Sequence, residues 1–450
     1  SMNDTIAMIS TPLGSGGISI IRISGQEALI IVNKLFRGKD LYKVASHTIH
    51  YGHIVDKNEV IDEVLVSVMK APKTYTREDV VEISCHGGVF VTNKILEMLL
   101  VAGARLAEPG EFTKRAFLNG RIDLTQAESI MDIIEAKTKT NLKIANLGLR
   151  GDVKRLIDDF RSRLLTCMAK IEVNIDYPEY EDEEQITIEI LKPTMEAMNE
   201  ELESILNKCE TSRIIKEGIK TVIIGKPNVG KSSLLNALLR EEKAIVTDIA
   251  GTTRDIVEGK ANIGGIILNL IDTAGIRDSS DVVEKIGIKK TKEAINMADL
   301  IILVFDNSTP LDDYDRKLLE LTEDKRRIIV INKQDLQPKI NLTEIKDYIL
   351  LSSFNEKDIE KLENKIKEEC IVGNINEMDA SYIGNARQVA KLKQAKKAIE
   401  DSLQSIKEKM PIDIVSIDIK AAWHYLGEIT GDVANESLIN ELFSKFCLGK

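Results

Sequence analysis

The sequence predicts a multidomain protein of mixed α/β and α class, in which an N-terminal α+β domain precedes a helical domain that a mainly parallel α/β domain interrupts. Length is the first observation, because 450 residues exceed what one hydrophobic core usually serves. Composition is the second: 43% hydrophobic, 30% charged and 4% aromatic residues are typical of a globular protein rich in helix-forming residues. The third is the order of hydrophobic patterns, since strand-like and helical runs alternate regularly only in the middle of the chain.

The N-terminal part, residues 1–119, mixes short β-like runs with glycine-marked turns and one helical stretch. The β-like runs include Ile18–Ile23 and Val80–Ser84, and the helical stretch covers Val91–Val101. From 120 to 217, apolar residues recur every three or four positions, which is the pattern of packed helices. We therefore expect an α+β domain followed by the first part of a helical domain.

In residues 218–378, short apolar runs such as Ile301–Phe305 alternate with helical patterns. This alternation predicts strand-helix units around a mainly parallel sheet. The last part, 379–450, returns to helical periodicity, so we expect one helical domain with an inserted α/β domain whose ends lie close together. An acidic stretch, Tyr177–Glu184, is interpreted as a solvated loop rather than a metal site, because charge runs usually mark solvated surface.

Charge and cysteine content restrict the class of protein. A net charge of −11 argues against a protein coated with basic surface, so any nucleic-acid contact requires a local patch. The cysteines lack CxxC spacing, which favours free thiols in a reducing cytoplasm. No apolar run is long enough to span a bilayer, and the first residues do not resemble a signal peptide. We expect a cytoplasmic protein without membrane attachment.

A phosphate-binding loop is the most specific local signal. The apolar strand Thr221–Ile224 leads into GKPNVGKS, which matches G-x-x-x-x-G-K-[ST], and an amphipathic helix follows. In such a loop, backbone N–H groups surround the phosphates, Lys231 brings positive charge to the β and γ groups, and Ser232 ligates Mg²⁺. A glycine turn that merely caps a helix is the alternative, and the flanking strand and helix disfavour it.

The choice of base depends on a motif about 100 residues downstream. Asn332, Lys333, Gln334 and Asp335 follow an apolar strand and give the NKxD pattern. A carboxylate there accepts hydrogen bonds from N1 and N2 of guanine, which adenine does not offer. Leu351-Ser352-Ser353 follows where GTPases carry a second base-contacting loop. The pattern predicts GTP as the nucleotide.

Two further motifs lie between these loops. Asp272-Thr273-Ala274-Gly275 ends the strand Ile266–Ile271, where a carboxylate acts on Mg²⁺ and a glycine N–H senses the γ-phosphate. Gly251-Thr252-Thr253-Arg254-Asp255 supplies the threonine-bearing switch, and its resemblance to the GTPase pattern implies Thr253 as the second Mg²⁺ ligand. Ras-like enzymes orient the attacking water with a glutamine after the DxxG motif, but this position is Ile276 here. Another residue must position the water, and no arginine finger is identifiable.

Several segments together resemble the MnmE family, also called TrmE, and they span the chain. Inside the nucleotide domain they are GKPNVGKSS, TDIAGTTRD and IDTAGIRDSSDVVEKIG; outside it they are DTIAMISTPLGSGGISIIRISG, YTREDVVEISCHGG, GEFTKRAFLNGRIDLTQAESI and FCLGK. The resemblance implies a Ras-like P-loop GTPase domain, a folate-binding and dimerising N-terminal domain, and a homodimer. It also implies that the switch faces of two nucleotide domains meet during the cycle.

The resemblance further implies activation by K⁺ in the place of an arginine finger. The implied K⁺ ligands are Asn228, the backbone at Thr247 and Ile249, and Thr252. The family's water-positioning glutamate maps onto Glu284, although a solvated helix carboxylate is the simpler interpretation of this residue alone. The candidate GTP-binding residues are Asn228, Val229, Gly230, Lys231, Ser232, Ser233, Thr247, Asp248, Ile249, Ala250, Gly251, Thr252, Thr253, Asp272, Thr273, Ala274, Gly275, Asn332, Lys333, Asp335, Ser352, Ser353 and Phe354.

Members of the family bind a tetrahydrofolate derivative and act with the flavoprotein MnmG on the wobble uridine of tRNA. The resemblance places the folate at Arg22, Glu82, Arg121 and Lys450, and it makes Cys447 a candidate participant in the modification chemistry. It also implies a heterotetramer with MnmG. A lone cysteine is more often an inert packed residue or an exposed thiol.

Two other functions remain as alternatives. A regulatory switch GTPase of ribosome assembly, without modification chemistry, shares the phosphate loop, DTAG and NKxD. No KH-like GxxG segment follows the nucleotide domain, and FCLGK fits a modification enzyme better. A P-loop kinase or ATPase is disfavoured by the NKQD sequence at 332–335.

Overall fold

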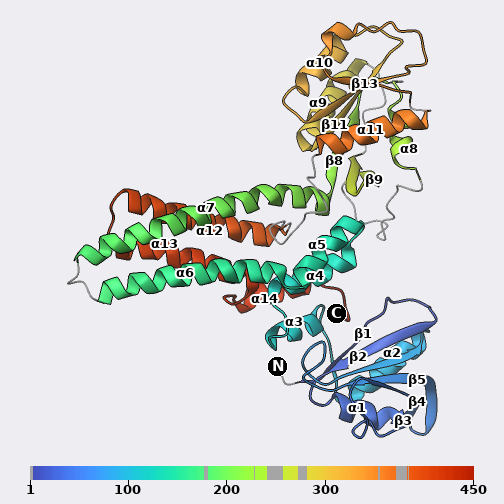
Figure 1. Ribbon diagram of the computed structural model, residues 1–450. Coiled ribbons are helices and arrows are strands. Elements are labelled where there is room, and N and C mark those ends of the chain that lie inside the picture. Colours follow the sequence, from blue (N-terminus) through green and yellow to red (C-terminus); the bar gives the residue numbers. More distant parts are fainter. Residues whose placement is uncertain are drawn as a thin grey trace. The chain divides into compact units, whose positions relative to one another are not determined.

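The computed structural model describes residues 4–176, 181–227, 229–240, 257–271, 281–352, 355–370, 383 and 385–450. These residues fall into two compact units. The first unit comprises Ser1–Met131, Gly148–Lys192 and Lys397–Lys450, and the second comprises Asp132–Leu147 and Pro193–Lys396. Figure 1 shows one sheet in each unit and, apart from the sheets and the helices packed on them, a group of long helices. The multidomain α/β and α class is confirmed, whereas the boundaries at 119, 217 and 378 stay predictions.

A mixed seven-stranded sheet, ordered β3-β4-β5-β6-β2-β1-β7, forms the N-terminal part of the first unit. Its strand pairs are antiparallel except for β1 with β7. The strands are β1 (Ile6–Ile9), β2 (Ile18–Ser24), β3 (Phe36–Arg37), β4 (Thr48–Asp56), β5 (Glu59–Met69), β6 (Val80–His86) and β7 (Arg105–Leu106).

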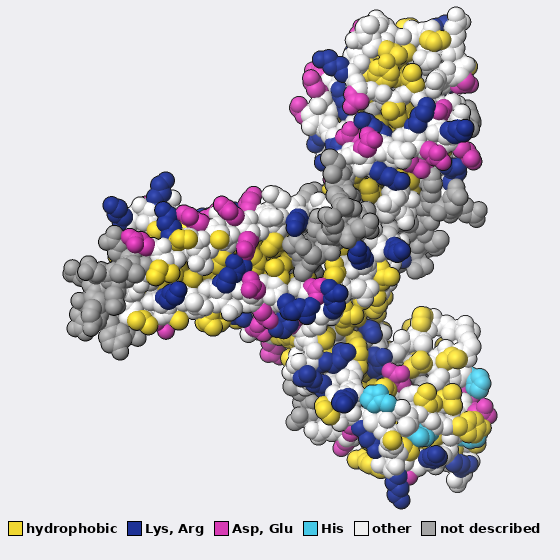
Figure 2. All heavy atoms as spheres, viewed as in Figure 1, with side chains coloured by type: hydrophobic (Ala, Val, Ile, Leu, Met, Phe, Trp, Pro, Cys, Tyr) yellow, Lys and Arg dark blue, Asp and Glu magenta, His cyan; other side chains and the backbone are white. Residues whose placement is uncertain are grey.

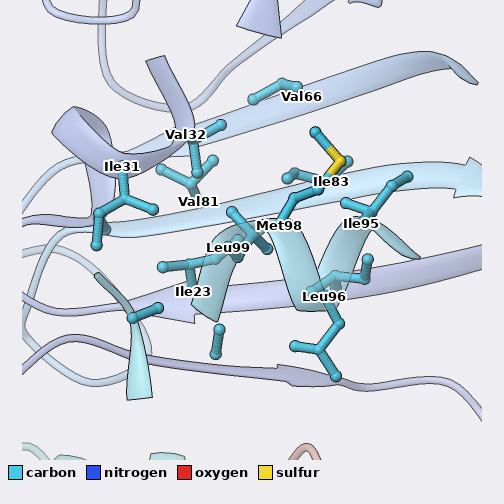
Figure 3. Close-up of a cluster of buried hydrophobic side chains, with 14 of the residues drawn as sticks. Ile23, Ile31, Val32, Val66, Val81, Ile83, Ile95, Leu96, Met98 and Leu99 are labelled. Atoms are coloured by element: carbon cyan, nitrogen blue, oxygen red, sulfur yellow. The ribbon is translucent and has the colours of Figure 1, made fainter. Parts of the chain in front are cut away.

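Helices α1 (Ala28–Leu35) and α2 (Val89–Val101) pack against this sheet. Alternate residues of the strands enter the core with them, because successive side chains of a strand point to opposite faces. Figure 3 shows Ile23 of β2 and Ile83 of β6 beside Leu99 of α2, all of which are fully buried. The opposite faces of β2 and β6 therefore present Arg22 and Glu82, which are directly paired in register.

The helical part of the first unit begins with α3 (Glu111–Leu118) and α4 (Leu124–Glu135), and α5 (Lys139–Leu149) straddles the division between the units. The helices that follow are α6 (Asp152–Asp176), α7 (Glu181–Glu217), α12 (Ala386–Lys407), α13 (Ile412–Thr430) and α14 (Glu436–Ser444). Of the helices named here, α4, α7 and α12 also cross the division between the units. Phe443 and Phe446 pack with apolar residues of α3 and α4, so the end of the chain is held beside α3.

The acidic stretch departs from its predicted loop structure. Residues 177–180 lie outside the described residues, but Glu181–Glu184 form the first turn of α7, so a loop there is wrong. The positive end of the helix dipole favours acidic residues in a first turn, and a charge run alone does not reveal this. No group of three or more His, Cys, Asp or Glu side chains arranged to hold a metal ion occurs among the residues that the structure describes.

The second unit carries a six-stranded sheet in the order β13-β12-β11-β8-β10-β9, which is parallel except for the β10–β9 pair. The predicted mainly parallel sheet is therefore confirmed. The strands are β8 (Ile219–Ile224), β9 (Val257–Ile263), β10 (Ile266–Ile271), β11 (Leu300–Asp306), β12 (Arg327–Asn332) and β13 (Tyr348–Leu350). The associated helices are α8 (Lys231–Leu238), α9 (Asp281–Met297), α10 (Asp313–Leu321) and α11 (Glu356–Glu369), with a short 3₁₀ helix at Leu342–Glu344.

Strand β11 lies at the centre of the second sheet and is buried along its whole length. Its side chains alternate between two apolar cores, one containing Ile302 and the other Phe305. Because both faces of β11 are covered by apolar cores, its residues form a continuous apolar run, and LIILVF shows no alternation of apolar and polar residues. Figure 2 shows acidic and basic side chains interspersed on the visible surface. No helix in the described part of the chain is sufficiently long and apolar to traverse a membrane.

Arg115 fixes α3 against the N-terminal sheet. Its side chain is 3% exposed and donates to the Asp4 carbonyl oxygen at 2.6 Å, to Asp4 Oδ1 at 2.7 Å and to Glu78 Oε2 at 3.1 Å. Arg105 donates to Asp4 Oδ2 at 2.6 Å. The hydrogen bond from Arg105, assisted by Arg115, lowers the pKa of Asp4 from its ordinary value of 3.8 to about 2.

Asp4→Asn is expected to lower the free energy of unfolding by about 1–2 kcal/mol at neutral pH, after allowance for the partial exposure of the pair. The folded-state pKa lies below that of the unfolded chain, so this stabilisation is present above about pH 4 and is lost as the pH falls towards 2. Urea unfolding followed by fluorescence of Trp423, the only tryptophan, measures it. Glu59→Gln, at an exposed position, is the control. An equal loss of unfolding free energy in both variants would contradict the role of Asp4.

Candidate functional site

The nucleotide-site candidates gather at one edge of the second sheet. Strands β8, β11 and β12 run parallel, so their carboxyl ends meet at the same edge. The residues after β8 are the phosphate loop, and those after β12 are the NKxD loop. Ligands of open α/β sheets bind outside the carboxyl ends of the strands.

The phosphate loop has the backbone geometry of an anion site. Gly230 has φ 95° and precedes the first residue of α8, Lys231. Ser232 and Ser233 follow in the first turn of α8, whose backbone N–H groups have no partner within the helix. The Lys231 ammonium donates to the Gly225 carbonyl oxygen at 2.8 Å and so lies across its own loop. A Cβ on Gly225 would come within 2.5 Å of the Val304 carbonyl oxygen, which explains the glycine there.

The NKxD loop is joined to the phosphate loop by a buried hydrogen bond. The side chain of Asn332 is 1% exposed, and its Nδ2 donates to the Val229 carbonyl oxygen at 2.8 Å. The Gln334 backbone N–H donates to the Leu351 carbonyl oxygen at 3.2 Å, which brings Ser352 beside the same loop. Asp335 is exposed next to them. The phosphate loop and the base-recognition loop are therefore adjacent and are joined by the hydrogen bond from Asn332 to Val229.

Several sequence-predicted residues lie outside the described residues. For Glu284, the backbone belongs to α9, but the structure does not describe the side chain. The other predicted residues outside the described ranges are Asn228, Thr247, Asp248, Ile249, Ala250, Gly251, Thr252, Thr253, Asp272, Thr273, Ala274, Gly275, Ser353 and Phe354.

Three of the four folate candidates lie over one aromatic ring in the first unit, and the fourth, Glu82, is bonded to one of them. The Arg22 guanidinium lies 5.1 Å from the centre of the Tyr75 ring, that of Arg121 lies at 5.2 Å, and the Lys450 ammonium lies at 4.7 Å. Arg22 Nε donates to Glu82 Oε1 at 3.1 Å. Cations within about 6 Å of a ring centre are attracted by its π electrons. We call Tyr75, the three cations over its ring and the Glu82 carboxylate bonded to Arg22 the Tyr75 cluster.

The last residues of the chain are held in the Tyr75 cluster by backbone contacts. The Lys450 carbonyl oxygen accepts from the Thr113 N–H at 2.8 Å and from Thr113 Oγ1 at 2.7 Å. The Gly449 carbonyl oxygen accepts from Ser10 Oγ at 2.9 Å. Burial lowers the pKa of Lys450, and the charges of Arg22 and Arg121 lower it further. The cluster is therefore short of negative charge and suits an anionic ligand.

Sequence reasoning missed Tyr75 and Thr113. The Tyr75 hydroxyl and Thr113 Oγ1 are 2.8 Å apart, and burial raises the pKa of Tyr75. Both residues lie inside segments that carry the family resemblance, in YTRED and EFTKR. Tyr75 stands between Thr74 and Thr76, so its immediate neighbours gave no signal. Its partners Thr113 and Lys450 are 38 and 375 positions away, so spacing alone does not connect them.

Cys447 is the exposed cysteine, whereas Cys85, Cys167, Cys209 and Cys370 are buried. Burial raises the pKa of these four thiols, which makes them poorer nucleophiles. Cys447 lies three residues before Lys450, whose N–H donates to its carbonyl oxygen at 3.4 Å. It is therefore the cysteine that a solvent-borne substrate reaches.

A phosphate loop bonded to an NKxD loop, at the carboxyl edge of a mainly parallel sheet, defines a P-loop protein of the GTPase class. Comparison with known proteins gives the family. Residues 124–447 match the model described as the MnmE helical domain, and residues 5–121 match the model of the GTP-binding protein TrmE N-terminus. The chain belongs to the MnmE (TrmE) family of tRNA modification GTPases.

Relatives named tRNA modification GTPase MnmE match nearly the whole chain. One from Streptococcus thermophilus is 53% identical over 99% of this chain and 98% of its own length. One from Bacillus cytotoxicus is 51% identical over 99% of both chains. Among solved structures, the G domain of the FeoB iron transporter of T. maritima is 32% identical with a TM-score of 0.26, covering 34% of this chain and 98% of that one. Aquifex aeolicus Era bound to GDP and AlF4⁻ is 25% identical with a TM-score of 0.26, covering 40% of this chain and 66% of that one.

Proposed function

We propose that this chain hydrolyses GTP to drive modification of the wobble uridine of tRNA. It acts with the flavoprotein MnmG to add a carboxymethylaminomethyl-type group at C5 of U34, with a tetrahydrofolate derivative as the carbon source. The observation that carries the proposal is the Tyr75 cluster, because a GTPase that serves only as a switch has no use for a second, cationic ligand site in the same chain. The family name of the relatives supports the tRNA substrate.

At the nucleotide site, Lys231 offsets negative charge that develops on the phosphates during transfer. Ser232, in the first turn of α8, would hold Mg²⁺ through its hydroxyl, with Thr253 as the second ligand. Bound Mg²⁺ neutralises phosphate charge. Asp335 selects guanine through N1 and N2. The carboxylate of Asp272, at the end of β10, acts on the same metal.

We further propose K⁺ as an activating ion, held by Asn228, Thr247, Ile249 and Thr252, and Glu284 as the residue that positions the attacking water. Replacing K⁺ by Na⁺ is expected to lower GTP turnover, because the smaller ion fits an oxygen cage built for K⁺ poorly. Glu284→Ala is expected to lower turnover by about a hundredfold in either salt, with nucleotide affinity retained. Equal rates in K⁺ and Na⁺ would remove the ion from the proposal, and unchanged turnover of the variant would remove Glu284.

At the folate site, the roles follow from charge. Glu82 accepts hydrogen bonds from the donor groups of the pterin, and Arg22, Arg121 and Lys450 attract the anionic glutamate tail. The exposed thiol of Cys447 lies close in sequence to this site and is a candidate participant in the modification chemistry. Full modification activity of Cys447→Ser would exclude that role.

The proposed assembly is a cytoplasmic homodimer that joins MnmG in a heterotetramer and binds tRNA. The proposed domains are 1–119 for folate and dimerisation, 120–217 and 379–450 for the helical domain, and 218–378 for GTP hydrolysis. Mass analysis of wobble uridines in cells that lack the protein tests the whole proposal. We expect the C5 group to be missing and restored by the intact gene. Unaltered tRNA would instead leave a switch GTPase as the function.

A further inference from the structure

The NKxD loop contains a strained residue at its centre. Lys333 has φ 62°, in the left-handed region that residues with a side chain seldom adopt. Such a conformation persists only where neighbouring groups hold it. Lys333 stands between Asn332, which is bonded to the phosphate loop, and the base-recognition residue Asp335. A contact that orients Lys333 therefore acts only two residues from the Asp335 carboxylate.

Asp306, the last residue of β11, supplies this constraint. Its carboxylate is 9% exposed, and Oδ2 accepts from the Lys333 ammonium at 2.9 Å. The other oxygen, Oδ1, accepts from the Ser308 N–H at 2.8 Å and from Ser308 Oγ at 2.6 Å. Burial raises the pKa of Asp306, but the bonds from Ser308 and Lys333 outweigh it and leave the group ionised at neutral pH.

The next residue, Asn307, holds the rest of the loop. Its N–H donates to the Asn332 carbonyl oxygen at 2.9 Å, and its Nδ2 donates to the Leu336 carbonyl oxygen at 3.3 Å. Its own carbonyl oxygen accepts from the N–H groups of Lys339 and Ile340. The end of β11 thus contacts the loop at several points. The ion pair with Asp306 is one contact of the strained residue, whose carbonyl oxygen also accepts from the Leu336 N–H at 2.9 Å.

We propose that Asp306 is a positioning residue for guanine recognition, which acts through Lys333 to align the Asp335 carboxylate with N1 and N2 of the base. The inference rests on the proposed function, since it assumes a guanine nucleotide at this site. It adds a specificity determinant that lies outside the NKxD sequence, on a different strand.

Binding of GDP and IDP to the full-length protein, measured by calorimetry, tests the proposal. IDP lacks the 2-amino group, so the ratio of the two affinities reports how well Asp335 is aligned with N2. Asp306→Asn keeps the shape but loses the charge, and we expect GDP to bind about tenfold more weakly, the size of one lost charge-assisted hydrogen bond. IDP should lose less, so the GDP-to-IDP ratio should fall.

Lys333→Met removes the other partner and leaves Asp306 with its bonds from Ser308, so it tests the same contact if Asp306→Asn fails to fold. We expect the ratio to fall here too, and the double variant to lose no more than the larger single effect. Asp313→Asn, at an exposed carboxylate of α10, is the matched control. An unchanged ratio in both single variants would overturn the inference, whereas failure of the unaltered protein to bind GDP would overturn the proposed function itself.

Discussion

Lys231→Ala is expected to lower GTP turnover by at least about a hundredfold, because it removes the positive charge that stabilises the phosphates in the transition state. The ammonium already lies over the loop, 2.8 Å from the Gly225 carbonyl oxygen, and GTP binding would exchange this acceptor for phosphate oxygens. Little reorganisation is needed at the moment of reaction. Turnover measured by phosphate release, at saturating GTP, checks the prediction.

The control for this variant is Lys317→Ala, at an exposed lysine of α10. It removes the same charge from the same unit and should leave turnover unchanged. Far-ultraviolet circular dichroism of both variants establishes that the fold is intact. Turnover of Lys231→Ala within a few-fold of the unaltered protein, with an intact fold, would mean that the reaction takes place elsewhere.

The nucleotide site could be predicted from the sequence because its residues are local to strand ends. Apolar runs fix β8 and β12. Lys231, in the loop and helix after β8, and Asn332, the last residue of β12, must then lie at one edge of a parallel sheet. The contribution of Asp306 could not be predicted, since it depends on the side-by-side pairing of β11 and β12. Strand order is a long-range property that hydrophobic periodicity does not encode.

The folate candidates show a different limit. Arg22 and Glu82 have ordinary sequence contexts, and only the register of β2 with β6 makes them partners. Lys450 and Tyr75 come together because Phe443 and Phe446 pack on α3 and α4 and carry the end of the chain to the N-terminal sheet. Resemblance to the family suggested four of these residues. The geometry adds that Arg22, Arg121 and Lys450 lie over one aromatic ring, whereas Glu82 is bonded to Arg22.

Gly449→Val is expected to weaken the binding of 5-formyltetrahydrofolate, a stable one-carbon folate, by about tenfold to a hundredfold, the range for a lost hydrogen bond to a charged group. Gly449 has φ 84°, and a Cβ there would lie 2.4 Å from the Ile9 carbonyl oxygen and 2.6 Å from the Ser10 Cα. These are backbone atoms at the end of β1, which do not move aside. The last two residues must leave their place, and the Lys450 ammonium leaves the Tyr75 ring with them.

The affinity for GDP distinguishes this displacement from general unfolding, because the nucleotide loops lie in the other compact unit. We expect it to stay unchanged in Gly449→Val. Leu448→Ala, at an exposed neighbouring position, is the matched control and should bind folate as the unaltered protein does. Lys450→Ala should weaken folate binding as much as Gly449→Val does, if the glycine acts by placing the Lys450 ammonium. Normal folate binding by Gly449→Val would show that the end of the chain does not form the site, and the Tyr75 cluster would then be a structural contact of α3.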